Sequence, residues 1–103
     1  GTSLAPGIIK GQIVSKEDNK PIESATLTIR NAASLKEIIK TIETDKKGMF
    51  EVELPSRNQY IITIAVEGYR GAMKSYLLAS DQPLDIGIIE MLKDTRQSQS
   101  ASE

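Results

Sequence analysis

The chain has 103 residues and a mass of 11.3 kDa, so its length predicts a single domain with one hydrophobic core. Charged residues make up 26% and apolar residues 39%, which is typical of globular proteins. The net charge of −1 is weak evidence against a nucleic-acid-binding protein, which usually carries a basic face, although it leaves room for a local basic patch. The absence of histidine and cysteine excludes a Ser-His-Asp triad, a thiolate nucleophile and a Cys/His zinc site. We therefore expect no enzymatic activity, no cofactor and no nucleic-acid partner.

The two ends of the chain differ in composition from the rest. The opening GTSLAPG lacks the charged and apolar regions of a signal peptide. We interpret residues 1–7 as a leader that is disordered or was left by cloning behind a removed export signal. The closing DTRQSQSASE is polar and lacks periodicity, so residues 93–103 are predicted to be a tail or linker. Residues 8–92 remain as the folded domain, and no run approaches the ~20 apolar residues of a membrane span.

Turn signals separate six β-branched or apolar runs. These runs cover residues 8–14, 25–30, 49–54, 60–67, 73–78 and 85–92. The turns between them are KEDNKP, TDKKG, PSRNQ, EGYRG and SDQP. Residues 34–43, which precede TDKKG, are ambiguous. Short strands at intervals of ~8–12 residues predict an antiparallel sandwich or a small barrel.

Three of these runs predict how the strands are buried. The apolar positions alternate in two of them, at Ala25, Leu27 and Ile29 and at Phe50, Val52 and Leu54. Such alternation predicts strands with one buried and one exposed face. The run 60–67 is apolar on both faces, because Ile61 and Ala65 lie opposite the stripe that begins at Tyr60. This pattern predicts a central strand that is covered on both sides.

The segment SLKEIIKTIE, residues 34–43, carries two conflicting signals. Its aliphatic residues Leu35, Ile38, Ile39 and Ile42 have the i, i+3, i+4, i+7 spacing of an amphipathic helix. Ser34 and Glu37 match a capping box at the start of that helix. The same residues form a β-branched run, and sheet pairing often overrides local propensity. We favour a strand from about residue 38 to residue 44, preceded at most by one helical turn.

The sequence TDKKG, residues 44–48, places Asp45 three residues before Gly48 and permits three interpretations. A calcium loop would continue with further oxygen ligands, whereas this stretch supplies Lys46 and Lys47, whose charges repel a cation. A phosphate-binding loop would need the G-x-x-x-x-G-K-[ST] pattern, which is absent. Aspartate at the first position and glycine at the fourth are typical of a type I turn. We therefore predict a hairpin turn here.

Two clusters of acidic side chains are further candidate sites. Glu17, Asp18 and Asn19 could coordinate a cation, but an exposed polar loop tip is the simpler interpretation. Glu51 and Glu53 could be the paired carboxylates of a hydrolase. Because they lie two residues apart on one strand face, we expect a solvated stripe that opposes aggregation.

The sequence EGYRG, residues 67–71, is the remaining surface candidate. Tyr69 and Arg70, flanked by glycines, could form an interaction tip. The alternative that we favour is structural, with Gly68 making the turn and Tyr69 packing over the edge of the sandwich. We assign no residue of the chain as catalytic, cofactor-binding or metal-ligating.

Several short motifs follow one another along the chain in the order of a known family. They are Gly11 with Ile13, Pro21 with Ala25, Thr44 with Asp45, Gly48 and Phe50, then Tyr60, and finally Gly68 with Tyr69. With this order and spacing, residues 8–91 resemble the carboxypeptidase regulatory-like domain. The resemblance implies an all-β fold, namely a seven-stranded antiparallel Greek-key β-sandwich of the transthyretin-like, or prealbumin-like, class.

The resemblance also implies a cellular context. Domains of this family accompany zinc carboxypeptidases, where they are not catalytic, and precede the plug and barrel of many TonB-dependent outer-membrane receptors. The closing LDIGIIEML, residues 84–92, is similar to the last strand of the receptor-associated subtype. The implied function is a non-catalytic, exported accessory domain at the N-terminus of such a receptor, on the periplasmic side of the outer membrane or at the cell surface. Its expected partners are a protein or the adjoining receptor domains, with indirect membrane association through the barrel.

A second class of function is a stand-alone carbohydrate- or ligand-binding, or adhesion, module of the periplasm or cell surface. Carbohydrate-binding modules present exposed aromatic side chains on one face. The aromatic residues of this chain are Phe50, Tyr60, Tyr69 and Tyr76, and at least two of them are expected to be buried. An enzyme is the third class, and the missing histidines and cysteines argue against it.

Overall fold

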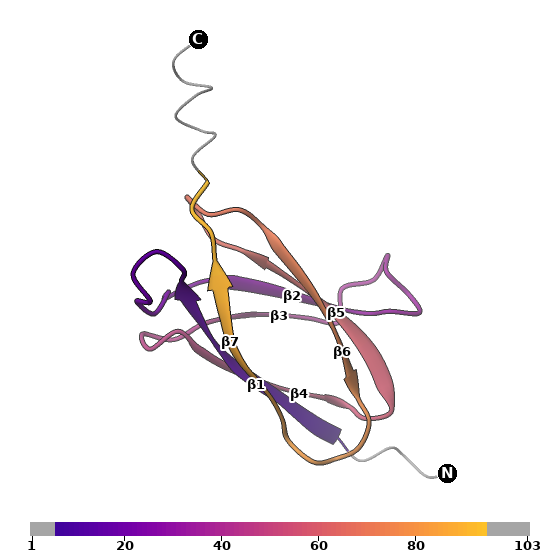
Figure 1. Cartoon of the computed structure of the whole chain (residues 1–103). Coiled ribbons are helices and arrows are strands. Elements are labelled where there is room, and N and C mark those ends of the chain that lie inside the picture. Colours follow the sequence, from indigo (N-terminus) through magenta and orange to yellow (C-terminus); the bar gives the residue numbers. More distant parts are fainter. Residues whose placement is uncertain (1–5, 95–103) are drawn as a thin grey trace, which may run out of the picture.

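The computed structural model describes residues 6–94, which form two β-sheets packed face to face (Figure 1). The strands are β1 (Pro6–Ser15), β2 (Thr26–Asn31), β3 (Lys40–Glu43), β4 (Met49–Pro55), β5 (Asn58–Ala65), β6 (Ala72–Leu78) and β7 (Leu84–Met91). One sheet has three strands in the order β4-β1-β7, and the other has four in the order β3-β2-β5-β6. The predicted seven-stranded β-sandwich is confirmed.

One pair of strands departs from the predicted antiparallel arrangement. β1 and β7 run parallel, whereas β1–β4, β2–β3, β2–β5 and β5–β6 are antiparallel. Parallel neighbours need a long crossover, and here five intervening strands supply it. Because β1 is the first strand and β7 the last, the chain enters the sandwich at one end and leaves it at the opposite end (Figure 1).

The core lies between the sheets and follows the alternation in the sequence. Ala25, Leu27 and Ile29 are fully buried around β2, and Phe50, Val52 and Leu54 of β4 are at most 5% exposed. The other members of the core are Ile9, Ile13, Ile22, Tyr60, Ile62, Ile64, Leu78, Ile89 and Met91. Burial of each large aliphatic side chain contributes about 1.5–3 kcal/mol, so this cluster is the main source of stability.

β5 confirms one half of its prediction and contradicts the other. It is central, because it pairs with β2 on one side and with β6 on the other. The expectation that both faces are covered is wrong, since Ile61 is only half-buried and Ala65 is exposed. Residues 6–94 supply two layers, so the outer face of the four-stranded sheet meets solvent, where β-branched residues remain favoured by strand propensity.

The ambiguous segment ends as a strand, but that strand begins later than predicted. β3 starts at Lys40 instead of residue 38, and residues 32–39 form turns without a helix. Ile42 explains the outcome, because pairing in register with Leu27 packs its side chain against the core. A helix over residues 34–43 would give up this pairing, so tertiary packing overrides the local helix signal.

A buried threonine fastens the two sheets together at one end. The hydroxyl of Thr44 accepts a hydrogen bond from the Ala25 amide (2.9 Å) and donates one to the Ile22 carbonyl (2.7 Å). The Thr44 amide also donates to the Ala25 carbonyl (3.1 Å). The Ile22 amide in turn donates to the carbonyl of Ile13 in β1 (2.9 Å). We call Ile13, Ile22, Ala25 and Thr44 the clasp, because they join β1, the loop before β2 and the segment after β3.

The folded region extends slightly beyond the predicted limits of residues 8 and 92. β1 begins at Pro6 and pairs with β4 from its first residue. At the other end, Lys93 forms a bridge with Tyr69, and the Asp94 amide donates to the Gly68 carbonyl (3.0 Å). The rest of the predicted leader and tail lies outside the described residues. None of residues 6–94 forms a helix that could cross a membrane.

Tyr60 couples the core to the turn between β4 and β5. Its ring is almost completely buried, and its hydroxyl donates to the Pro55 carbonyl (2.5 Å). Burial raises the pKa of Tyr60 above its ordinary value, which itself lies well above neutral pH, and the protonated phenol is a hydrogen-bond donor. This bond holds the start of β5 against the end of β4.

The clasp makes a prediction about stability. Thr44→Val keeps the shape of the side chain but deprives the buried Ala25 amide and Ile22 carbonyl of a partner. Each unpaired group costs about 1–3 kcal/mol, so we expect the free energy of unfolding to fall by about 2–4 kcal/mol in urea titrations. Thr28→Val, on the outer face of β2, is the matched control and should change it by less than about 0.5 kcal/mol. Equal effects of the two substitutions would contradict the clasp.

Candidate functional site

The TDKKG stretch is a tight turn, as predicted. One carboxylate oxygen of Asp45 accepts the amides of Lys47 and Met49, both at 2.9 Å. The Gly48 amide donates to the Asp45 carbonyl (2.9 Å), and Gly48 has a φ of +73°. The predicted hairpin is wrong, however, because β3 and β4 belong to different sheets. The turn is a crossover between the sheets, and the Asp45 carboxylate accepts hydrogen bonds from the chain's own backbone.

The cluster Glu17, Asp18 and Asn19 lies in the exposed loop after β1. Glu17 forms an ion pair with Lys93 (3.2 Å), and their hydrogen bond raises the pKa of Lys93. An oxygen of Asp18 accepts the Lys20 amide (3.2 Å), and Asn19 has a φ of +59°, as in a turn. Within residues 6–94 no three acidic side chains gather as a metal site would require. The loop is therefore organised by contacts within the chain.

The two remaining candidates also take structural roles. Glu51 and Glu53 are exposed on the outer face of β4, and Lys10 of β1 is the cross-strand neighbour of Glu51. A lysine, not a second carboxylate, thus faces this stripe. In EGYRG, Gly68 has a φ of +86° and Tyr69 packs against the core, which is the alternative that the sequence favours.

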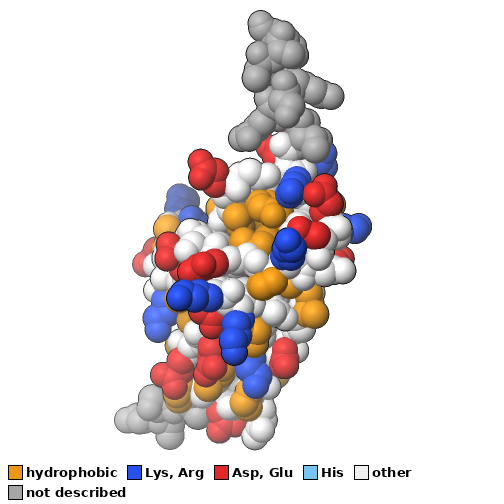
Figure 2. All heavy atoms as spheres, turned by 90° about the vertical axis from the view of Figure 1, so that its left-hand side faces the viewer, with side chains coloured by type: hydrophobic (Ala, Val, Ile, Leu, Met, Phe, Trp, Pro, Cys, Tyr) orange, Lys and Arg blue, Asp and Glu red, His pale blue; other side chains and the backbone are white. Residues whose placement is uncertain are grey.

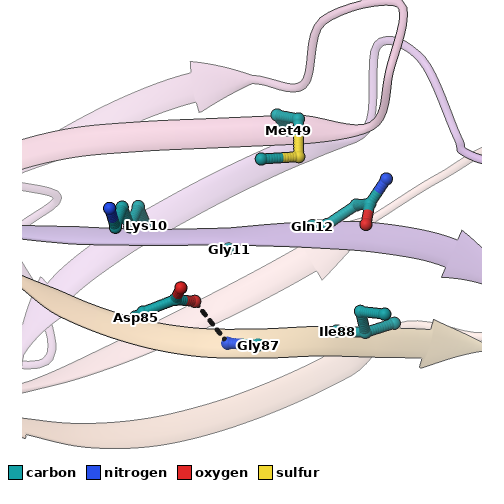
Figure 3. Close-up of a pocket in the computed structure, with 7 residues that line it drawn as sticks. All are labelled: Lys10, Gly11, Gln12, Met49, Asp85, Gly87 and Ile88. Carbon is teal, nitrogen blue, oxygen red and sulfur yellow. Dashed lines mark hydrogen bonds between the residues drawn. The ribbon is translucent and has the colours of Figure 1, made fainter.

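The structure adds a feature that sequence reasoning missed, a shallow hollow on the outer face of the three-stranded sheet (Figure 3). Its volume is about 240 Å³. It is lined by Lys10, Gly11, Gln12, Met49, Asp85, Gly87 and Ile88. A smaller hollow of about 160 Å³ shares Lys10 and Met49 with it. We refer to the larger one as the sheet hollow.

A β-bulge in β7 shapes the sheet hollow. Ile86 and Gly87 together stand opposite the single residue Gly11. Gly87 has a φ of +78°, and its amide donates to the Asp85 carboxylate at 2.9 Å (Figure 3). A side chain at Gly11 would meet Ile86 Cγ1 at 2.7 Å and Phe50 Cζ at 3.0 Å. The Asp-x-Gly pattern inside a strand is the signal that could have revealed the bulge.

The sheet hollow has the chemistry of a contact surface. Lys10, Gln12 and Asp85 supply a cation, an amide and an anion, while Met49 and Ile88 are 43% and 63% exposed and supply apolar surface. It contains no nucleophile paired with a base. The face of the molecule shown in Figure 2 mixes acidic, basic and apolar side chains. The absence of catalytic, cofactor and metal residues stays a prediction.

The comparison with protein families decides the class of domain. The model of the carboxypeptidase regulatory-like domain matches residues 8–91. The chain belongs to this family. No curated protein sequence matches it significantly. This match confirms the resemblance to the carboxypeptidase regulatory-like domain that the sequence motifs indicated. Three of the motif residues, Ile13, Ala25 and Thr44, belong to the clasp.

Solved structures of very different proteins share the fold. The Bacillus anthracis TIE protein is 22% identical, with a TM-score of 0.69 over 86% of this chain and 18% of its own. The group B streptococcus pilus 2b backbone protein is 13% identical, with a TM-score of 0.68 over 89% and 43%. The 3-chlorocatechol 1,2-dioxygenase from Rhodococcus opacus is 13% identical, with a TM-score of 0.66 over 89% and 62%.

These likenesses bear on the fold alone. The chain spans less than two thirds of each of these proteins, and every identity is below 25%. By their names, one is a pilus component and one is an enzyme, so the sandwich itself does not decide between activity and contact.

Two glycines with positive φ form a matched pair for a test of the crossover turn. A Cβ at Gly48 would lie 2.4 Å from the Ile13 carbonyl oxygen, whereas one at Gly68 would meet nothing within 4 Å. Gly68→Ala should cost about 1–2 kcal/mol, since only the left-handed backbone is strained. Gly48→Ala should cost about 3 kcal/mol or more, because a backbone clash inside the clasp is added. Equal losses in urea unfolding would show that the crossover is not tightly packed.

Proposed function

We propose that this domain is a non-catalytic interaction module of an exported protein, carried at the N-terminus of a TonB-dependent outer-membrane receptor for nutrient uptake. Membership of the carboxypeptidase regulatory-like family supports the class of module. The lack of histidine and cysteine supports the absence of catalysis. In this role the domain lies on the periplasmic side of the outer membrane or at the cell surface.

The parallel pairing of β1 with β7 is the observation that carries the proposal. It places the first and last described residues at opposite ends of the sandwich (Figure 1). A domain with this geometry fits in series within a longer chain, because it separates the preceding segment from the next one by the length of a strand, roughly 30 Å. Such an exit directs the following segment away from the end at which the chain enters the sandwich.

In this role the domain acts through protein contacts, either with the adjoining receptor domains or with a separate protein. The sheet hollow offers a mixed polar and apolar surface on the three-stranded sheet, of the kind found at the rim of protein interfaces. Weak contacts suffice when the domain is covalently linked to its receptor, because the linkage raises the effective concentration.

The experiment is to follow the native protein in its own cells. Its reading frame should continue past Glu103 into plug and barrel sequence, and peptides of this domain should occur in the outer-membrane fraction on a chain far longer than 103 residues. A receptor that lacks residues 6–94 should reach the membrane at normal levels but support slower growth on its limiting nutrient. A stop codon after Glu103, or a free chain of domain size in the cytoplasm, contradicts the receptor role.

The sheet hollow also supports a second candidate, a stand-alone carbohydrate- or ligand-binding, or adhesion, module. Against a carbohydrate ligand, no aromatic side chain lines the hollow, and Phe50 and Tyr60 are buried. A glycan array probed with the purified domain separates the candidates. Binding that is lost in Met49→Asp but kept in Met73→Asp, on the opposite sheet, would favour this second function over the receptor role.

A further inference from the structure

The connection between β2 and β3 is longer than the sheet requires. These strands are antiparallel neighbours, which about two to five residues can join, yet the chain uses residues 32–39. The extra length carries three large aliphatic side chains into solvent: Leu35 is 56% exposed, Ile38 54% and Ile39 42%. We call residues 32–39 the apolar loop, and it projects from one side of the sandwich (Figure 1).

The base of the apolar loop is firmly attached. On one side the Ala32 amide donates to the Gln59 carbonyl (2.8 Å), and on the other the Ile39 amide donates to the Ile29 carbonyl (2.8 Å). An oxygen of the Asn31 side chain accepts the amide of the second loop residue (2.8 Å). Leu35 and Ile38 are thus exposed on an anchored protrusion, and Ile39 is exposed at its base.

The helix pattern of the sequence overlaps this loop, which forms no helix but retains the hydrogen bond between Ser34 and Glu37. Leu35, Ile38 and Ile39 have the spacing that places them on one side of a helical turn, while Lys36 and Glu37 fall on the other. The Ser34 hydroxyl already donates to the Glu37 carboxylate (3.2 Å), as at the start of a capped turn. The loop therefore carries both exposed aliphatic and exposed charged side chains.

We propose that the apolar loop docks on a lipid surface with anionic headgroups. A protrusion with three exposed aliphatic side chains offers too little area for a stable interface with a second protein, which needs about 1,000 Å² or more. A bilayer surrounds a convex tip on all sides and so buries it completely. Lys36 and Lys40 outnumber Glu37 beside the tip, which complements anionic lipid although the whole chain has a net charge of −1. This inference does not rest on the proposed receptor role.

Because the chain contains no tryptophan, a single tryptophan can report insertion. Ile38→Trp is expected to give a blue-shifted emission with vesicles of phosphatidylcholine and phosphatidylglycerol in equal parts. Met73→Trp is the matched control: Met73 is 70% exposed on β6, away from the loop, and its tryptophan should not shift. An unshifted Ile38→Trp spectrum, or equal shifts of both variants, would overturn the proposal.

Co-sedimentation of the unlabelled domain with the same vesicles gives an independent measure. Replacing Leu35, Ile38 and Ile39 together by serine should weaken binding at least about tenfold, and Lys36→Gln with Lys40→Gln should weaken it only on anionic vesicles. Met73→Ser is the control and should bind as the parent does. Circular dichroism checks that each variant folds. If the loop variants instead abolish a concentration-dependent dimer seen without vesicles, a second copy covers the loop and the lipid proposal is wrong.

Discussion

One buried hydroxyl, that of Thr44, links the two sheets of the sandwich through directional hydrogen bonds. Thr44 directly follows β3 of the four-stranded sheet, and its hydroxyl is hydrogen-bonded to the backbone of Ile22 and Ala25 in the loop before β2. The Ile22 amide is in turn hydrogen-bonded to Ile13 in β1 of the three-stranded sheet. At that end the sheets are also joined by the Arg70 amide, which donates to the Leu92 carbonyl (2.8 Å), and by the bridge between Tyr69 and Lys93. The Thr44 bonds add a buried, directional link to the apolar contact, which is non-directional. The clasp gives the packing a defined register.

Because the family motifs have structural roles, surfaces for contact with other molecules have to lie elsewhere in the domain. The residues that mark the family have structural roles. Asp45 accepts backbone amides of its own turn, Gly11 leaves room for the bulge in β7, and Thr44 forms the hydrogen bonds of the clasp. Among residues 6–94, the surfaces open to contact include the sheet hollow, the apolar loop, and the two points where the chain enters and leaves. Because β1 and β7 are parallel, these two points lie at opposite ends of the sandwich.

The sequence predicts well whatever depends on local alternation. Strand faces in β2 and β4 follow from period-two patterns, and the Asp45 turn follows from its side-chain chemistry. The partner of each strand is not a local property, so the parallel β1–β7 pair and the crossover after β3 could not be deduced. The apolar residues on the outer face of β5 led to a wrong prediction of burial, because strand propensity and burial both favour β-branched residues. The sheet hollow depends on a bulge, whose only trace in the sequence is Asp85 before Gly87.

The parallel pairing of β1 and β7 places the domain's entry and exit at opposite ends, which suits a place in series within a longer chain, and one distance tests this directly. The chain has no cysteine, so Pro6→Cys and Lys93→Cys together provide two unique positions for spin labels. Pulsed electron paramagnetic resonance should give a separation of about 30 Å, the length of β1 at roughly 3.3 Å per residue. A separation below about 15 Å would mean that the first and last strands run antiparallel with their outer ends together. That result would contradict the topology and the role in series that we derive from it.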